Sequence, residues 1–105
     1  MNKKTVSPYD AGLIAGAGAE AKMQMSAFEM SVQSLDFTIG YIIGYSRSES
    51  IRSASHHIEA STAGELGFLY KLPFETLRQH YKDTFDEELH RVMRQAYEDA
   101  AEGDE

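Results

Sequence analysis

Residues 62–82, TAGELGFLYKLPFETLRQHYK, decide the fold that the sequence predicts. They indicate a short helix, a tight corner at residues 71–72, and a second helix that opens at Pro73. Thr62 can cap the first helix with Glu65 three residues later, which is the capping-box pattern. Pro73 suits a first helical position, because its missing N–H would have no partner there. Two helices joined by so short a corner must cross steeply, so the stretch predicts a helix-turn-helix unit.

The unit places small and apolar residues where such a motif needs them. Gly67 falls where the two helices would cross and where only a small side chain fits. Lys71 departs from the usual pattern, because most such turns have a glycine that adopts a left-handed backbone angle. The apolar positions that we expect to be buried are Leu66, Tyr70, Leu72 and Leu77.

The second helix of this unit carries candidate DNA-binding residues. Arg78 and Gln79 are residue types that read base edges, and Lys71 and Lys82 could hold phosphates. Residues 66–82 contain only three cationic residues and one acidic residue, which is a weak charge for tight DNA binding. On the outer side of the helix we expect Phe74, Glu75, Arg78, Gln79 and Lys82.

Towards the N-terminus, Ser7 and Pro8 are typical of a helix start. We expect a helix over about residues 9–22 that is rich in small residues. Gly12 and Gly16 lie four apart on one face of it, so another helix could approach closely.

A second helix is expected to start after Ser26 and to end at about residue 46. Gly40 and Gly44 repeat the glycine spacing of the first helix, so the simplest prediction is that the two glycine faces meet. The apolar spacing of four, three, four and three predicts the central core helix of the fold. Its members are Phe28, Val32, Leu35, Ile39 and Ile42.

The remaining segments have weaker patterns. Residues 46–61 are serine-rich and polar, which predicts a frayed helix end, a loop and a short helical turn. Residues 73–101 keep helical spacing, but Thr84 with Glu87 forms another possible capping box, so we expect two segments with a kink at 82–84. Residues 1–7 and 102–105 are expected to fray.

Composition limits the functional classes. The chain has 105 residues, no cysteine and a net charge of −7, and its apolar runs are too short to span a bilayer. We therefore expect a single cytoplasmic domain without a membrane partner. Residues 83–105 hold two arginines and nine acidic residues and account for the whole net charge, so residues 1–82 are neutral.

No pattern of catalytic residues is apparent. The histidines His56, His57, His80 and His90 have no acidic partner at a diagnostic spacing, and the adjacent pair 56–57 diverges on a helix. We therefore predict neither an enzyme nor a metal or cofactor site, and expect His56 and His57 to be exposed or to cap a helix.

Two resemblances add to these patterns. The segment LYKLPFETLRQHYKDTFDEEL is similar to small phage and prophage helix-turn-helix proteins, over about the last 45 residues. Over nearly the whole chain, the motifs GLIAG, IIGYS and AGELGFLYKL resemble a family of small uncharacterised enterobacterial proteins. These resemblances imply a phage or enterobacterial setting, and the second implies that the glycine-rich helix and the corner belong to one fold.

The sequence thus predicts an all-α domain of four or five helices and leaves two functions open. The first is a phage or bacterial regulatory protein that binds DNA through Lys71, Arg78, Gln79 and Lys82, and that could pair as a homodimer. The second is a non-enzymatic inhibitor or adaptor, a phage factor that binds a host or defence protein. Its contact residues would be Asp86, Glu87 and Glu88 on the acidic final helix.

Overall fold

Helices are the regular structure of residues 6–19 and 24–103, which the computed structural model describes, and these residues contain no strand. The all-α prediction is confirmed. There are six helices over this part of the chain rather than four or five, because a single turn is separate from the long helix that follows it. The elements are α1 (Pro8–Gly18), α2 (Ala27–Met30), α3 (Leu35–Ser53), α4 (His56–Leu69), α5 (Phe74–His80) and α6 (Glu87–Gly103).

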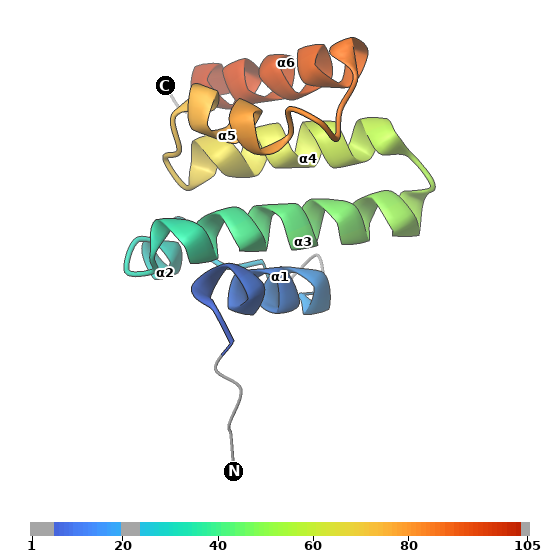
Figure 1. The fold of residues 1–105 in the computed structure, drawn as a ribbon. Coiled ribbons are helices and arrows are strands. Elements are labelled where there is room, and N and C mark those ends of the chain that lie inside the picture. The colour runs from blue at the N-terminus through green and yellow to red at the C-terminus, as the bar shows by residue number, and fades with distance from the viewer. Residues whose placement is uncertain (1–5, 20–23, 104–105) are drawn as a thin grey trace.

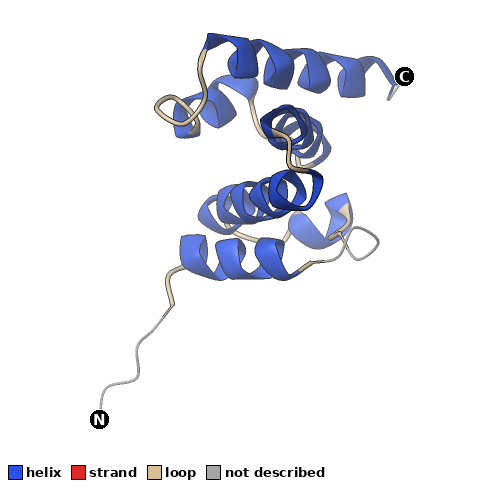
Figure 2. Ribbon diagram, turned by 90° about the vertical axis from the view of Figure 1, so that its right-hand side faces the viewer, coloured by secondary structure: helices blue, strands red, loops and turns tan. Residues whose placement is uncertain are grey.

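The four longer helices are stacked in the order α1, α3, α4, α6, and α5 lies across α4 and α6 (Figure 1). The view turned by 90° shows α1 and α6 on opposite sides of α3 and α4 (Figure 2). Helices α1 and α3 run in the same direction and are linked through the short α2. Helices α4 and α6 likewise run in the same direction and are linked through the short α5. The molecule therefore consists of two halves of similar layout, which meet where α3 packs on α4.

Glycines set the distance between α1 and α3, and the prediction that the two glycine faces meet is confirmed. A Cβ atom built on Gly12 would lie 2.2 Å from the carbonyl oxygen of Phe37, and one on Gly16 would lie 2.3 Å from that of Tyr41. From the other side, a Cβ on Gly40 would lie 2.2 Å from the carbonyl oxygen of Tyr9. The two backbones are thus in direct contact, which no residue with a side chain would allow at these positions.

A glycine also allows close packing of the backbones of α4 and α6. A Cβ on Gly64 would lie 2.2 Å from the carbonyl oxygen of Met93. At the other end of α4, a Cβ on Gly67 would lie 2.7 Å from the Leu77 side chain, so Gly67 occupies the crossing with α5 as predicted.

Aromatic and small polar residues fill the interface between the two halves. The Tyr41 ring packs edge-on against Tyr70, with ring centroids 6.0 Å apart. Both hydroxyls bind the backbone of Met25: Tyr41 accepts from its N–H at 2.8 Å, and Tyr70 donates to its carbonyl at 2.6 Å. Ser46 is fully buried on α3 and donates its hydroxyl to the carbonyl of Ile42. A buried residue as small as serine lets α3 and α4 approach closely.

The predicted helix from Ser26 to about residue 46 is wrong in its middle. Ser26 does begin a helix with a complete capping box, but the helix ends after one turn. Ser31 donates its hydroxyl to the carbonyl of Phe28 at 2.6 Å, and Ser34 then caps α3 by accepting from the Phe37 N–H. Serine side chains compete with helical hydrogen bonds in this way, and two of them three residues apart break the helix.

This break in the helix separates the five apolar residues that were predicted to form the central core helix. Ile39 and Ile42 are buried in the core as expected. Phe28, Val32 and Leu35 instead have exposed fractions of 82%, 78% and 56%, so the central core helix begins later than the spacing indicated.

The weak pattern of residues 46–61 does not mark a loop, and that prediction is wrong. Helix α3 continues to Ser53, and Ser55 caps α4 at His56 after a connection of two residues. Ala54 makes this tight connection with a left-handed φ of 54°. The low hydrophobicity was misleading, because buried serines such as Ser50 form part of the interface.

Several predicted helix ends also move. Thr62 and Glu65 lie inside α4 and do not start a helix, because Ser55 has already capped it. Helix α5 begins at Phe74, with Pro73 in the capping position. The two segments expected over residues 73–101 are confirmed, but the second begins at Glu87.

Asp86, rather than Thr84, caps α6 by accepting from the Leu89 N–H at 2.9 Å. The first helix ends at Gly18 because Ala19 is extended, and the expected continuation to residue 22 falls largely outside the described residues. Likewise, the predicted fraying of residues 1–7 and 102–105 falls partly outside the described residues, and α6 reaches Gly103.

The glycine contact gives a first prediction. Gly40→Ala should lower the free energy of unfolding by about 2–3 kcal/mol, because the new methyl group must separate two backbones. Gly18→Ala is the matched control: nothing lies within 4 Å of a Cβ there. It should leave stability unchanged or raise it by up to about 1 kcal/mol through helix propensity. Urea denaturation of both variants measures the difference, and equal effects would contradict the packing.

Candidate binding surfaces

The corner between α4 and α5 has the geometry of the predicted turn. Lys71 adopts a left-handed φ of 64°, at the position where such turns usually have glycine. The Leu72 N–H donates to the carbonyl of Gly67 at 2.9 Å, which closes the last turn of α4. The residues expected to be buried in this unit, Leu66, Tyr70, Leu72 and Leu77, are all buried.

The DNA-binding candidates are arranged less favourably for reading bases. Arg78 donates from Nε to Glu75 at 3.1 Å and donates a second hydrogen bond from Nη2 to the same carboxylate. Gln79 also donates to Glu75, at 3.3 Å. These hydrogen bonds, from Arg78 first and Gln79 second, lower the pKa of Glu75, so the carboxylate is ionised at neutral pH. Both base-reading candidates are therefore bound to an acidic residue of their own helix.

The remaining DNA-binding candidates do not lie together on one surface of α5. Lys71 and Lys82 are both exposed, but they flank α5 at its two ends. Phe74 was expected on the outer side and is instead half-buried against α6. Its ring packs edge-on against Tyr97 at 5.3 Å, and the guanidinium of Arg94 lies 4.5 Å from its centroid. Helix α5 has only seven residues and is packed against α6.

The acidic candidates at the start of α6 have structural contacts of their own. Asp86 caps the helix. The carboxylate of Glu88 lies 2.9 Å from His57 Nε2, and this contact joins the first turns of α4 and α6. Glu87 is exposed in the first turn. His57 and its neighbour His56 are exposed, as expected, and His56 lies 3.9 Å from the Glu59 carboxylate.

Further acidic residues follow along the same helix. The exposed carboxylates of α6 form what we call the acidic face. It gathers five carboxylates on one helix that also carries the exposed Arg91 and Arg94, whereas the three helices α1–α3 together hold four acidic residues and two arginines. Its members are Glu87, Glu88, Glu98, Asp99 and Glu102.

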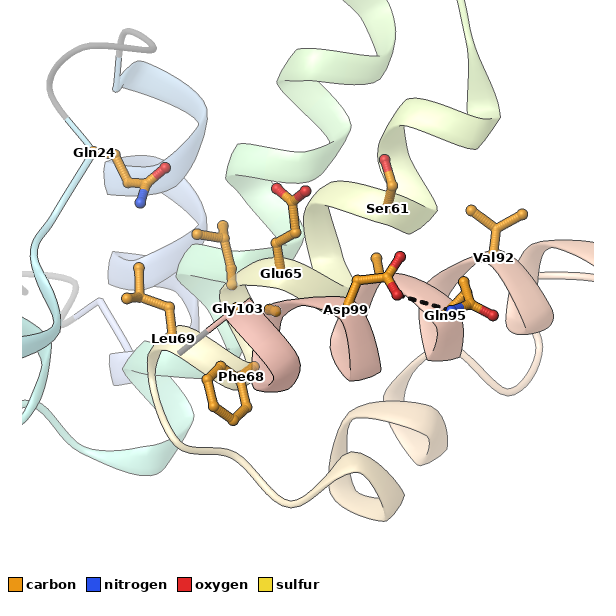
Figure 3. A pocket seen from close by; sticks show the side chains of 12 residues that line it. Gln24, Ser61, Glu65, Phe68, Leu69, Val92, Gln95, Asp99 and Gly103 are labelled. Carbon is orange, nitrogen blue, oxygen red and sulfur yellow. Dashed lines mark hydrogen bonds between the residues drawn. The ribbon is translucent and has the colours of Figure 1, made fainter. Parts of the chain in front are cut away.

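A groove of about 750 Å³ runs between α4 and α6 (Figure 3). Small residues, Ala96 and Ala100, lie along it on α6, and the apolar side chains of Leu69 and Val92 line it from the two helices. It was missed at the sequence level. The alanines of α6 could have indicated it, because their small side chains leave space along one edge of a helix whose exposed residues are mostly charged.

Carboxylates border this groove on both sides. Glu65 projects from α4 and Asp99 from α6, and both are exposed (Figure 3). Asp99 accepts a hydrogen bond from Gln95 at 2.9 Å. The described residues that line the groove include no lysine, arginine or histidine. The groove thus has a lining of small, apolar and uncharged polar side chains and two carboxylates at its rim.

Other chemistry finds little support in the described part of the chain. It contains no cluster of three or more histidine, cysteine, aspartate or glutamate residues that could hold a metal ion. Over the same ranges, no helix combines the length and hydropathy that crossing a bilayer requires.

Comparison with known proteins shows the family to which the chain belongs. Residues 5–99 match a family described as a protein of unknown function, DUF2623, and the chain belongs to that family. The match covers nearly the whole chain, as the second resemblance implied, whereas the resemblance to phage helix-turn-helix proteins receives no support. No curated protein and no solved structure gave a match to the chain.

The left-handed corner gives a second prediction. Lys71→Gly should raise the free energy of unfolding by roughly 0.5–1 kcal/mol, because glycine adopts a positive φ without the clash of a Cβ atom. Lys82→Gly is the control with the same loss of charge, at a residue outside the left-handed region. This control should not raise the free energy of unfolding. Thermal unfolding of the two variants measures the difference, and a loss of stability in Lys71→Gly would contradict the left-handed conformation of residue 71.

Proposed function

We propose that the protein is a non-enzymatic protein-binding factor, an inhibitor or adaptor, that uses the acidic face of α6 to contact a partner with a basic surface. The observation that carries this proposal is the concentration of charge: residues 83–105 hold nine acidic residues and two arginines, and the rest of the chain is neutral. A predominantly acidic surface steers association with a basic partner and disfavours acidic ones. Basic surfaces of this kind occur in proteins that handle nucleic acids.

The packing of α6 supports the same reading. Met93 is fully buried against α4, and Tyr97 donates its hydroxyl to the carbonyl of Leu72 at 2.5 Å. These contacts fix the inner side of α6 to the body of the protein. The acidic face is therefore presented on a rigid element, which reduces the entropy lost on binding.

A charge-neutralised variant tests this proposal. Glu98→Gln, Asp99→Asn and Glu102→Gln together should abolish capture of the partner from an extract of the cells that express the chain, because they remove three carboxylates of the acidic face. The matched control is Asp10→Asn with Glu29→Gln and Asp36→Asn, which removes three exposed carboxylates outside residues 83–105. The control should capture the same protein as the wild type. Quantitative mass spectrometry measures the capture, and circular dichroism shows that both variants are folded. A partner retained equally by both variants would refute the role of the acidic face.

DNA binding stays a second hypothesis, supported by the buried turn residues and by the exposed Lys71 and Lys82. The bonds from Arg78 and Gln79 to Glu75, and the acidic face nearby, weigh against it.

We expect no retardation of double-stranded DNA in a gel shift at about 0.15 M salt, a concentration that screens weak charge contacts. Glu75→Ala provides the sharper version of this experiment, since it releases Arg78 from its carboxylate. Retardation by the wild type that increases in Glu75→Ala and is lost in Arg78→Ala would establish DNA binding instead.

A further inference from the structure

The groove between α4 and α6 has a floor that suits the backbone of another helix. Ser61, Ala96 and Ala100 are small, and all three are partly covered rather than fully exposed. The apolar side chains of Leu69 and Val92 stand at its edges. Small residues at a helix contact allow close approach, as the glycines do between α1 and α3. A third helix laid here would face two parallel helices.

Charge decides which kind of helix would fit. Glu65 and Asp99 border the groove from opposite sides, and neither forms an ion pair with any described residue. Glu88, on the same edge of α6 as Val92 and Asp99, pairs with His57 near the start of both helices. An acidic peptide would meet repulsion at this rim, and so would the acidic face of a second copy of the chain. A cationic helix would meet two carboxylates at its flanks.

We infer that the groove between α4 and α6 binds an amphipathic helix of a partner protein, with apolar residues facing the floor and lysine or arginine at its flanks. This inference rests on the proposed function and assigns the binding site and the chemistry of the partner. It uses the helix-in-groove mode of recognition, in which apolar anchors on one helix face enter the groove. Asp99 belongs both to the acidic face and to the rim, and Glu65 extends the contact to α4.

A defined peptide tests the inference without knowledge of the natural partner. The probe is an 18-residue helical peptide of leucine and lysine with all leucines on one face, titrated into the full chain by isothermal calorimetry. Controls are the peptide with glutamate in place of lysine and a peptide of the same composition in scrambled order. The leucine–lysine helix should bind and both controls should not.

Matched charge reversals then locate the binding. Glu65→Lys with Asp99→Lys should weaken binding of the peptide by roughly tenfold or more, as expected when two rim pairs become repulsive. Asp10→Lys with Asp36→Lys changes the net charge by the same amount at exposed positions outside both the groove and the acidic face, and should weaken binding by less than about threefold, through general electrostatics only. In the wild type, the peptide should shift the NMR signals of Ser61, Val92 and Ala100.

Each contrary outcome has a distinct meaning. No binding of the cationic helix, or equal weakening by the two reversals, would overturn the groove as the site. Self-association of the chain that Glu65→Lys with Asp99→Lys abolishes would assign the groove to a second copy and overturn the inference as well. The proposed function would survive either result if neutralising the acidic face still abolished capture of the natural partner. It would fail if that capture persisted.

Discussion

The fold depends on direct contact between the backbones of α1 and α3. Gly12 and Gly16 on one helix and Gly40 and Gly44 on the other leave no side chain between them. Each glycine in a helix interior costs about 1 kcal/mol relative to alanine. That cost is offset by dispersion contacts along two closely packed helices, which are individually small and collectively large. Helix α1 also has few large side chains of its own, so this contact is its main attachment to the protein.

The interface between the two halves uses a different solution. Tyrosine rings occupy the volume, and their hydroxyl groups need partners because they are buried. Tyr41 and Tyr70 find theirs on the backbone of Met25, which ties the connection before α2 to the interface. Tyr81 is buried beside Ser46, and this burial raises the pKa of its hydroxyl, so the side chain stays neutral. Polar groups therefore take part in the core beside its isoleucines and leucines.

Sequence reasoning succeeded where one local rule determined the structure. The spacing of glycines predicted the contact between α1 and α3. The helix start at Pro73 indicated the corner at residues 71–72, where Lys71 adopts the left-handed angle although it is not a glycine. It failed where several rules competed. Ser34 and Ser55 cap helices, but serines such as Ser46 are buried, and composition alone does not separate these roles. Of the acidic candidates, Glu87 and Glu88 lie in the first turn of α6 and Asp86 caps that helix. The groove beside them depends on how two distant segments pack, so no single stretch of sequence encodes it.

The division into two halves has a consequence for how the chain folds. Within each half, the two paired helices run in the same direction, so their contacts join residues far apart in the chain, as between Gly12 and Phe37 and between Gly64 and Met93. The halves are joined by a connection of two residues at Ala54 and Ser55, which places α3 beside α4 as soon as both helices form. Contacts of low sequence separation favour rapid folding. The α3–α4 hairpin is therefore expected to form before the contacts within each half, so substitutions at the glycine contacts should act on the unfolding rate more than on the folding rate.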